Sequence, residues 1–309
     1  MSAQPALITL DAGGLRLAAW EWFAAQRGAA PTLLFVHATG FHGRVWDQVI
    51  HRLGARLPAP RHIVALELRG HGRSALPTHL PGGRPFDGWA DFGRDLAHAA
   101  QALGLQGALG IGHSMGAHSL LQAAAHVPAC FAALLAIDPV LFEPAAYHRL
   151  DAFDPQAAAR HPAAARKNLF SSPQAMVERF ATRQPYALFD PQALRDYCQH
   201  GLKPLPDGQG YSLCCAPLTE AMVYSSAAYN PGIYASLRAL QMPVQVVRVR
   251  DRDPAIQPFD PLGSPTWAGL VGELRQGREL HLPDHHHLLP MEDPALVAGL
   301  VAQLLHEMR

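Results

Sequence analysis

The stretch GALGIGHSMGAHSLLQAAAHVP, residues 107–128, places Ser114 between two glycines where a short apolar run meets a helical pattern. Serine is a common N-cap residue, so Ser114 could simply begin the helix. The alternative is a nucleophile, because G-x-S-x-G at a strand-to-helix junction lifts its serine above the end of the strand. Gly112 and Gly116 leave the room that such a tight turn requires. The context favours the nucleophile.

Short apolar runs alternate with helical patterns on both sides of this stretch. A hairpin is predicted over 6–22. The other short apolar runs are typical of strands that are buried on both faces. The alternation predicts a mostly parallel sheet with helices on both faces. The further strands are expected at 32–36, 62–66, 107–111, 133–137, 243–250 and 278–282, and helices at 90–104, 189–201, 264–277 and 293–308.

The pattern changes between about Pro139 and Gln241, where no strand is expected. Helical pieces divided by prolines and rich in large apolar side chains fill this segment. They predict a helical cap over residues 139–241, laid on a core formed by 1–138 and 242–309. Its apolar content suggests that the cap binds a partly hydrophobic substrate, with Phe180 and Tyr224 as candidate pocket residues.

A nucleophilic serine also needs donors for the oxyanion that forms on the substrate. The stretch LLFVHATGFHGRVW, residues 33–46, follows a predicted strand with a glycine-containing turn. Its amides, with Thr39 at the donor position, could meet the N–H of Met115 around that oxyanion. An ordinary loop at a strand end remains the alternative.

The candidate base lies among the eighteen histidines of the chain. In LPDHHHLLPMEDP, residues 282–294, His287 opens a loop that leads from the last strand into the final helix. Consecutive histidines cannot easily point at one ion, so a metal site is not expected. His285 and His286 are expected to face solvent or line a pocket, and His113 to support the site or line its pocket.

Together these motifs resemble those of the α/β-hydrolases. The resemblance rests on HATGFHG (37–43), LRGHGRS (68–74), GHSMG (112–116) and HLLPMEDP (287–294), and it covers nearly the whole chain except the cap. It implies an eight-stranded sheet with a cap inserted after the sixth strand, Ser114 as nucleophile and His287 as general base. The sequence departs from the usual pattern at Ala38, where these enzymes commonly carry glycine.

The acidic partner of His287 is the open question. Aligned on DRDP, the resemblance places the acid at Asp253, with Asp251 as a rival nearby. Asp138, at the end of the predicted strand 133–137, is a further candidate, because some members of this fold carry the acid there. Asp253 is preferred, because its loop normally faces the histidine loop.

Composition excludes several other classes of protein. Lys+Arg and Asp+Glu balance at 25 each among 309 residues, which gives no sign of binding to nucleic acid or to an anionic membrane. The four cysteines lack zinc-type spacing, and the N-terminal residues lack the pattern of a signal peptide. A cytoplasmic location is expected. No cofactor is expected, and a homodimer is left open.

The sequence thus predicts a serine hydrolase that cleaves a carboxylic ester of a medium-sized, partly hydrophobic small molecule through an acyl-enzyme. Cleavage of a C–C bond, lactone, thioester or amide by the same residues is the alternative within the fold. A protein that keeps the fold and only binds a small ligand is the second alternative.

Overall fold

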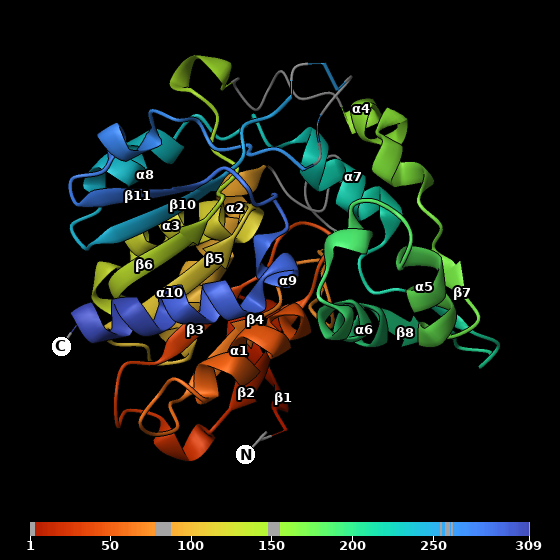
Figure 1. Cartoon of the computed structure of the whole chain (residues 1–309), viewed down its shortest axis with the longest axis horizontal. Coiled ribbons are helices and arrows are strands. Elements are labelled where there is room, and N and C mark those ends of the chain that lie inside the picture. The colour runs from red at the N-terminus through yellow and green to blue at the C-terminus, as the bar shows by residue number, and fades with distance from the viewer. Residues whose placement is uncertain are drawn as a thin grey trace.

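The computed structural model describes residues 4–77, 88–147, 155–253, 255–256, 260 and 262–308. An eight-stranded sheet lies at its centre, with helices on both faces (Figure 1), as predicted. The first two strands form the predicted antiparallel hairpin, the second also pairs antiparallel with β4, and the remaining pairs are parallel. In spatial order the strands are β1 (Ala6–Ala12), β2 (Leu15–Trp22), β4 (Ile63–Leu66), β3 (Leu33–Val36), β5 (Ala108–His113), β6 (Phe131–Ile137), β10 (Val244–Val249) and β11 (Gly277–Leu282).

Two layers of helices bury the faces of this sheet. Every residue of β3, β4 and β5 is buried, which explains why these strands read as unbroken apolar runs. One layer contains α2 (Trp89–Ala102), α3 (Met115–His126) and α8 (Ile233–Ala239), and the other contains α1 (Asp47–Gly54) and α10 (Pro294–Glu307).

The segment between β6 and β10 carries further helices beside the main sheet (Figure 1). Its helix α8 packs against α3, alongside the core helices. The segment also contains a small antiparallel sheet, which corrects the expectation that it holds no strand. These strands have two or three residues each, too few for a period-two pattern to stand out in the sequence. The elements are α4 (Pro155–Arg160), β7 (Leu169–Phe170), α5 (Pro173–Phe180), α6 (Pro191–His200), β8 (Leu202–Pro204), β9 (Tyr211–Leu213) and α7 (Pro217–Ser225).

The helix predicted over 264–277 does not form. Only a short 3-10 turn, Leu270–Glu273, occupies this stretch. Ser264, which would begin that helix, donates its hydroxyl to Asp138, and Thr266 forms a β-bridge with Leu141. Contacts with the end of β6 therefore override the local helical pattern.

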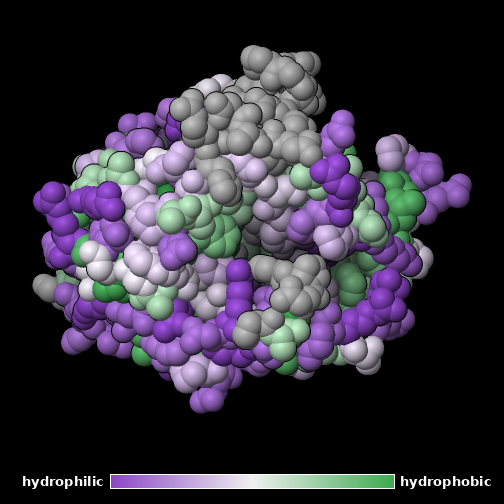
Figure 2. All heavy atoms as spheres, turned by 90° about the horizontal axis from the view of Figure 1, so that it is seen from above, coloured by the Kyte–Doolittle hydropathy of each residue, from purple (hydrophilic) through white to green (hydrophobic). Residues whose placement is uncertain are grey.

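Seen from above, hydrophilic side chains dominate the rim of the molecule, and hydrophobic side chains form smaller patches between them (Figure 2). Within the described residues, no helix is both long and apolar enough to cross a membrane.

Five buried histidines have rings that are hard to protonate. Burial lowers the pKa of His37 to about 3 and the pKa values of His71 and His118 to about 4. Burial also holds the pKa values of His42 and His113 well below the ordinary value. All five side chains are almost completely enclosed, so their neutral forms belong to the folded state.

We therefore expect the free energy of unfolding to fall as the pH drops from about 6.5 toward 4. In this range the histidines of the unfolded chain bind protons, whereas the five buried histidines of the folded chain stay neutral. Each of these five lowers the free energy of unfolding at pH 5 by about 2 kcal/mol at most. Urea unfolding at about pH 7.5 and pH 5 measures the loss. His118→Gln should reduce the difference between the two pH values, whereas His281→Gln, at an exposed position, should not. Equal stability at both pH values would contradict this expectation.

Candidate active site

Ser114 lies on a strained turn between β5 and α3, as the sequence predicted. Its φ of 57° and ψ of −120° place it outside the regions that L-residues favour, a conformation that costs on the order of 1–3 kcal/mol. The flanking glycines allow the turn. A Cβ on Gly112 would lie 2.6 Å from Ala117 Cα, and one on Gly116 would lie 2.4 Å from the carbonyl oxygen of His37. No larger residue fits at either position without moving the backbone.

His287 forms a hydrogen-bonded chain with Ser114 and an aspartate. Its Nε2 lies 3.0 Å from Ser114 Oγ, and its Nδ1 lies 2.6 Å from Asp138 Oδ2. Because a carboxylate accepts, Nδ1 carries the proton and Nε2 is free to accept the serine hydroxyl proton. The main-chain N–H of His287 donates to Leu262 O at 2.8 Å, which fixes the loop that precedes α9 (Leu289–Glu292).

Asp138 is held by donors from the end of β10 and from the loop that follows it. It follows β6 with a φ of 44°, and its side chain is fully buried. Its Oδ1 accepts the hydroxyl of Ser264 at 2.5 Å, the hydroxyl of Thr266 at 3.2 Å and the N–H of Val249 at 3.4 Å. These donors solvate a buried charge and leave Oδ2 for His287.

The acid preferred from the sequence, Asp253, does not face His287. Its side chain is exposed and accepts the N–H of Ala255 at 2.8 Å. The rival Asp251 is exposed as well and pairs with Arg248. The carboxylate beside His287 is Asp138, the second choice, because the chain after β10 turns outward and carries both other carboxylates into solvent.

His113 contacts the loop that carries His287. It is buried, and its Nε2 donates to the main-chain carbonyl of His287 at 2.7 Å. Burial, reinforced by the proximity of the His287 imidazole, holds the pKa of His113 well below its ordinary value. The contact fits the predicted supporting role, and a place for His113 in a pocket stays a prediction.

The predicted oxyanion residues lie on adjacent segments. Thr39 and Met115 are both buried, and the contact of Gly116 with His37 brings the start of α3 against the end of β3. The ring of His37 fixes the turn before Thr39, because Nδ1 donates to Ala38 O at 2.8 Å and Nε2 accepts from the N–H of residue 68 at 3.1 Å.

The predicted pocket residues of the cap differ in their surroundings. Phe180 is buried in the segment between β6 and β10, where its ring stacks on Tyr186 with centroids 4.2 Å apart. Its role in a substrate pocket stays a prediction. Tyr224 is 41% exposed, and its ring stacks on that of His161 with centroids 5.2 Å apart.

The sequence did not predict a buried ion pair that lies beside the turn holding Thr39. Glu220 of α7 pairs with Arg166, which also donates to the hydroxyls of Tyr186 and Tyr197. A Cβ on Gly40 would lie 2.6 Å from Glu220 Oε1, so this carboxylate packs against the residue after Thr39. Nothing in the local sequence marks Glu220, because its partner lies 54 residues away.

The other two histidines of the triple lie near acidic side chains. His286 Nδ1 lies 2.8 Å from Glu292 Oε1, and His285 lies 3.7 Å from Asp293. Across the part of the chain that the structure describes, no group of three or more His, Cys, Asp or Glu side chains could hold a metal ion.

Known proteins share this architecture. A 2-(acetamidomethylene)succinate hydrolase from Mesorhizobium japonicum is 28% identical over 225 residues, which are 72% of this chain and 72% of that protein. The crystal structure of E-2-(acetamidomethylene)succinate hydrolase has a TM-score of 0.73 at 21% identity and covers 98% of this chain and 99% of its own. An esterase from Mycobacterium tuberculosis has a TM-score of 0.62 at 21% identity, with 98% and 91% covered.

The sequence model of the alpha/beta hydrolase family matches residues 33–300, which include the strained serine turn and the histidine loop. The resemblance noted from the motifs is therefore confirmed. The chain belongs to the alpha/beta hydrolase family.

Proposed function

We propose that the chain is a serine hydrolase that cleaves carboxylic esters through an acyl-enzyme. The observation that supports this most strongly is the chain of contacts from Asp138 through His287 to Ser114, at 2.6 Å and 3.0 Å. This arrangement holds the imidazole in the tautomer that accepts a proton from the serine hydroxyl. The site residues of the proposal are those three, with Thr39 and Met115 as oxyanion donors.

In the proposed reaction, Ser114 Oγ attacks the carbonyl carbon of the ester and its proton passes to His287 Nε2. The main-chain N–H groups of Thr39 and Met115 stabilise the oxygen anion that results. The ester C–O bond then breaks, and the alcohol leaves with the proton from His287. A water molecule attacks the acyl-enzyme with help from the same imidazole, which releases the acid and restores Ser114. Asp138 stabilises the imidazolium in both halves of the cycle.

Two assays test the proposal. A fluorophosphonate probe is expected to label one serine, identified as Ser114 by peptide mapping, because the probe reacts with activated serine hydroxyls. A panel of nitrophenyl esters of increasing chain length is expected to show turnover, with an optimum above acetate because the cap is rich in apolar side chains. No label on Ser114 and no ester turnover would point to a protein that only binds a ligand.

Amide hydrolysis is the second candidate. The M. japonicum relative is named for a compound with an acetamido group, which is an amide, and it shares 28% identity with this chain. The same serine, histidine and aspartate can cleave either bond. Nitroanilides and nitrophenyl esters of the same acyl groups separate the two, since a preference for esters is expected here and a higher kcat/KM for the anilides would favour the amide.

A further inference from the structure

A pocket of about 400 Å³ opens where the core meets the cap. We call it the seam pocket. Its core wall is the loop after β4, with Gly70 and Arg73, and its cap wall comes from β8 and α7, with Lys203 and Thr219. This volume is in the range of pockets that hold small ligands.

The charged side chains that line the seam pocket are cationic. Of the described residues that line it, Arg73 and Lys203 are cationic and none is acidic. Lys203 is exposed on β8, opposite Ser212 of β9. The chain has only one other lysine, Lys167, and the rest of its 25 Lys and Arg residues are arginines. An anionic group is the complement of such a pocket.

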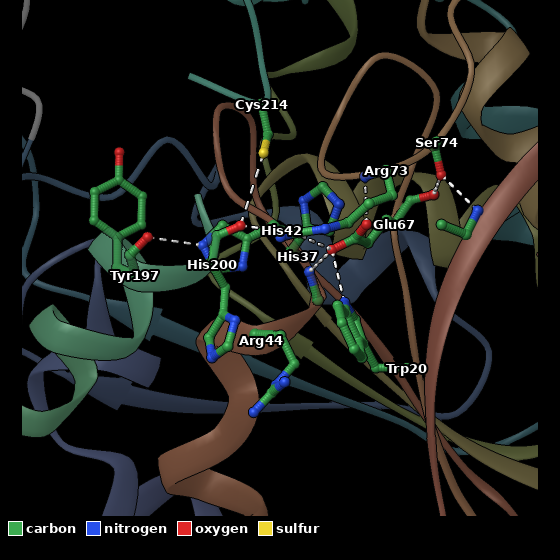
Figure 3. A network of polar contacts seen from close by, with 12 residues as sticks. Trp20, His37, His42, Arg44, Glu67, Arg73, Ser74, Tyr197, His200 and Cys214 are labelled. Carbon is green, nitrogen blue, oxygen red and sulfur yellow. Dashed lines mark hydrogen bonds and ion pairs between the residues drawn. The ribbon is translucent and has the colours of Figure 1, made fainter. Parts of the chain in front are cut away.

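Arg73, which lines the pocket, belongs to a network of polar contacts (Figure 3). Its guanidinium donates to His200 O at 2.5 Å, lies 3.8 Å from the buried carboxylate of Glu67 and sits over the ring of Trp20 at 5.5 Å. Glu67 also accepts the main-chain N–H groups of Arg73 and Gly43, at 2.6 Å and 3.2 Å. The pocket therefore has one cation held in place by several contacts, and the exposed Lys203 adds a second.

The seam pocket adjoins the proposed oxyanion turn. Cys214 lines it and also lines a small cavity whose wall includes Gly40. On α7, Thr219 packs against Gly70, while its neighbour Glu220 packs against Gly40. Since Gly40 directly follows Thr39, the start of α7 borders both the seam pocket, through Thr219, and the residue after Thr39, through Glu220.

We propose that the seam pocket binds an anionic oxygen group of the substrate, carried at a distance from the bond that is cleaved. The proposal rests on the proposed function and narrows its substrate class to esters with a remote negative charge. Lys203 attracts that group, and the fixed guanidinium of Arg73 orients it.

The experiment compares nitrophenyl monoesters of dicarboxylic acids of increasing length with neutral nitrophenyl esters of the same length. At the best length we expect kcat/KM to favour the anionic ester by about fivefold or more, since one or two partly exposed charge pairs supply a modest free energy. Added salt should reduce the preference, because it screens exposed charges.

Lys203→Glu is the decisive variant. Arg73 is less suitable, because its removal would leave the buried carboxylate of Glu67 without its ion pair. We expect Lys203→Glu to lower the ratio of anionic to neutral kcat/KM by about tenfold, mainly through KM. The matched control is Lys167→Glu, which alters a lysine that lies over Phe170, outside the seam pocket, and should leave the ratio unchanged.

The outcomes separate this proposal from the proposed function. If neutral esters are turned over but no anionic ester is preferred, or if both lysine variants change the ratio equally, the seam pocket proposal fails alone. If neither ester is turned over, the proposed function fails. In that case, calorimetric titration with glutarate tests whether the seam pocket binds an anionic group. Binding that weakens in Lys203→Glu and not in Lys167→Glu supports the seam pocket proposal, and any other result overturns it.

Discussion

Replacing Ser114 with alanine is expected to lower kcat/KM for nitrophenyl esters by about 10⁴-fold or more. The change removes the oxygen that lies 3.0 Å from His287 Nε2 and leaves the strained turn between β5 and α3 otherwise intact. The fold should survive, because one hydrogen bond contributes only about 0.5–1.5 kcal/mol to stability. Activity is measured on the purified variant, with urea unfolding as the check on folding.

The control is Ser226→Ala, which removes another buried serine hydroxyl, one that donates to Val223 O at 3.0 Å. It should keep its activity and its fluorophosphonate label, whereas Ser114→Ala should lose both. His287→Ala should match the loss at Ser114, and His286→Ala should lose far less, because that ring bonds to a different carboxylate. Activity of Ser114→Ala within about tenfold of wild type would refute the nucleophile assignment, since a triad member acts as part of a unit.

The elements that the sequence predicted well are those with strong local causes. The central strands are buried on both faces, so their apolar runs stand out in the sequence. The glycines on either side of Ser114 are required because backbone atoms pack closely against them in the strained turn. Two helix starts also have local causes, since Asp190 accepts two N–H groups of α6 and Asp293 accepts one of α10, each directly before a Pro.

The features that the sequence could not predict depend on contacts between distant segments. Asp138 and Asp253 both follow strands at the same edge of the sheet, so local pattern could not rank them. The choice depends on Ser264 and Thr266, which approach Asp138 from 126 and 128 residues away. The same two hydroxyls explain why the predicted helix over 264–277 fails, because they bond to the end of β6 instead of starting a helix.

Asp138→Asn is expected to lower kcat/KM by about 10⁴-fold, the loss seen when the equivalent aspartate of a serine protease is changed to asparagine. The physical reason lies in the three donors around Oδ1, of which the N–H of Val249 cannot turn away. An amide nitrogen is disfavoured at that position, so the amide oxygen occupies it and the nitrogen faces His287. The imidazole then accepts at Nδ1 and carries its proton on Nε2, the wrong tautomer to deprotonate Ser114.

Asp253→Asn is the matched control, because its carboxylate is exposed and bonds only the local turn at Ala255 among the residues described. It should retain nearly full activity, and the two variants should unfold at similar urea concentrations if the defect at Asp138 is one of chemistry. The reverse pattern, an active Asp138→Asn and an inactive Asp253→Asn, would restore the acid first preferred from the sequence. If both variants stay active, the carboxylate beside His287 does not orient the base, and catalysis cannot run through the chain of contacts that supports the proposed function.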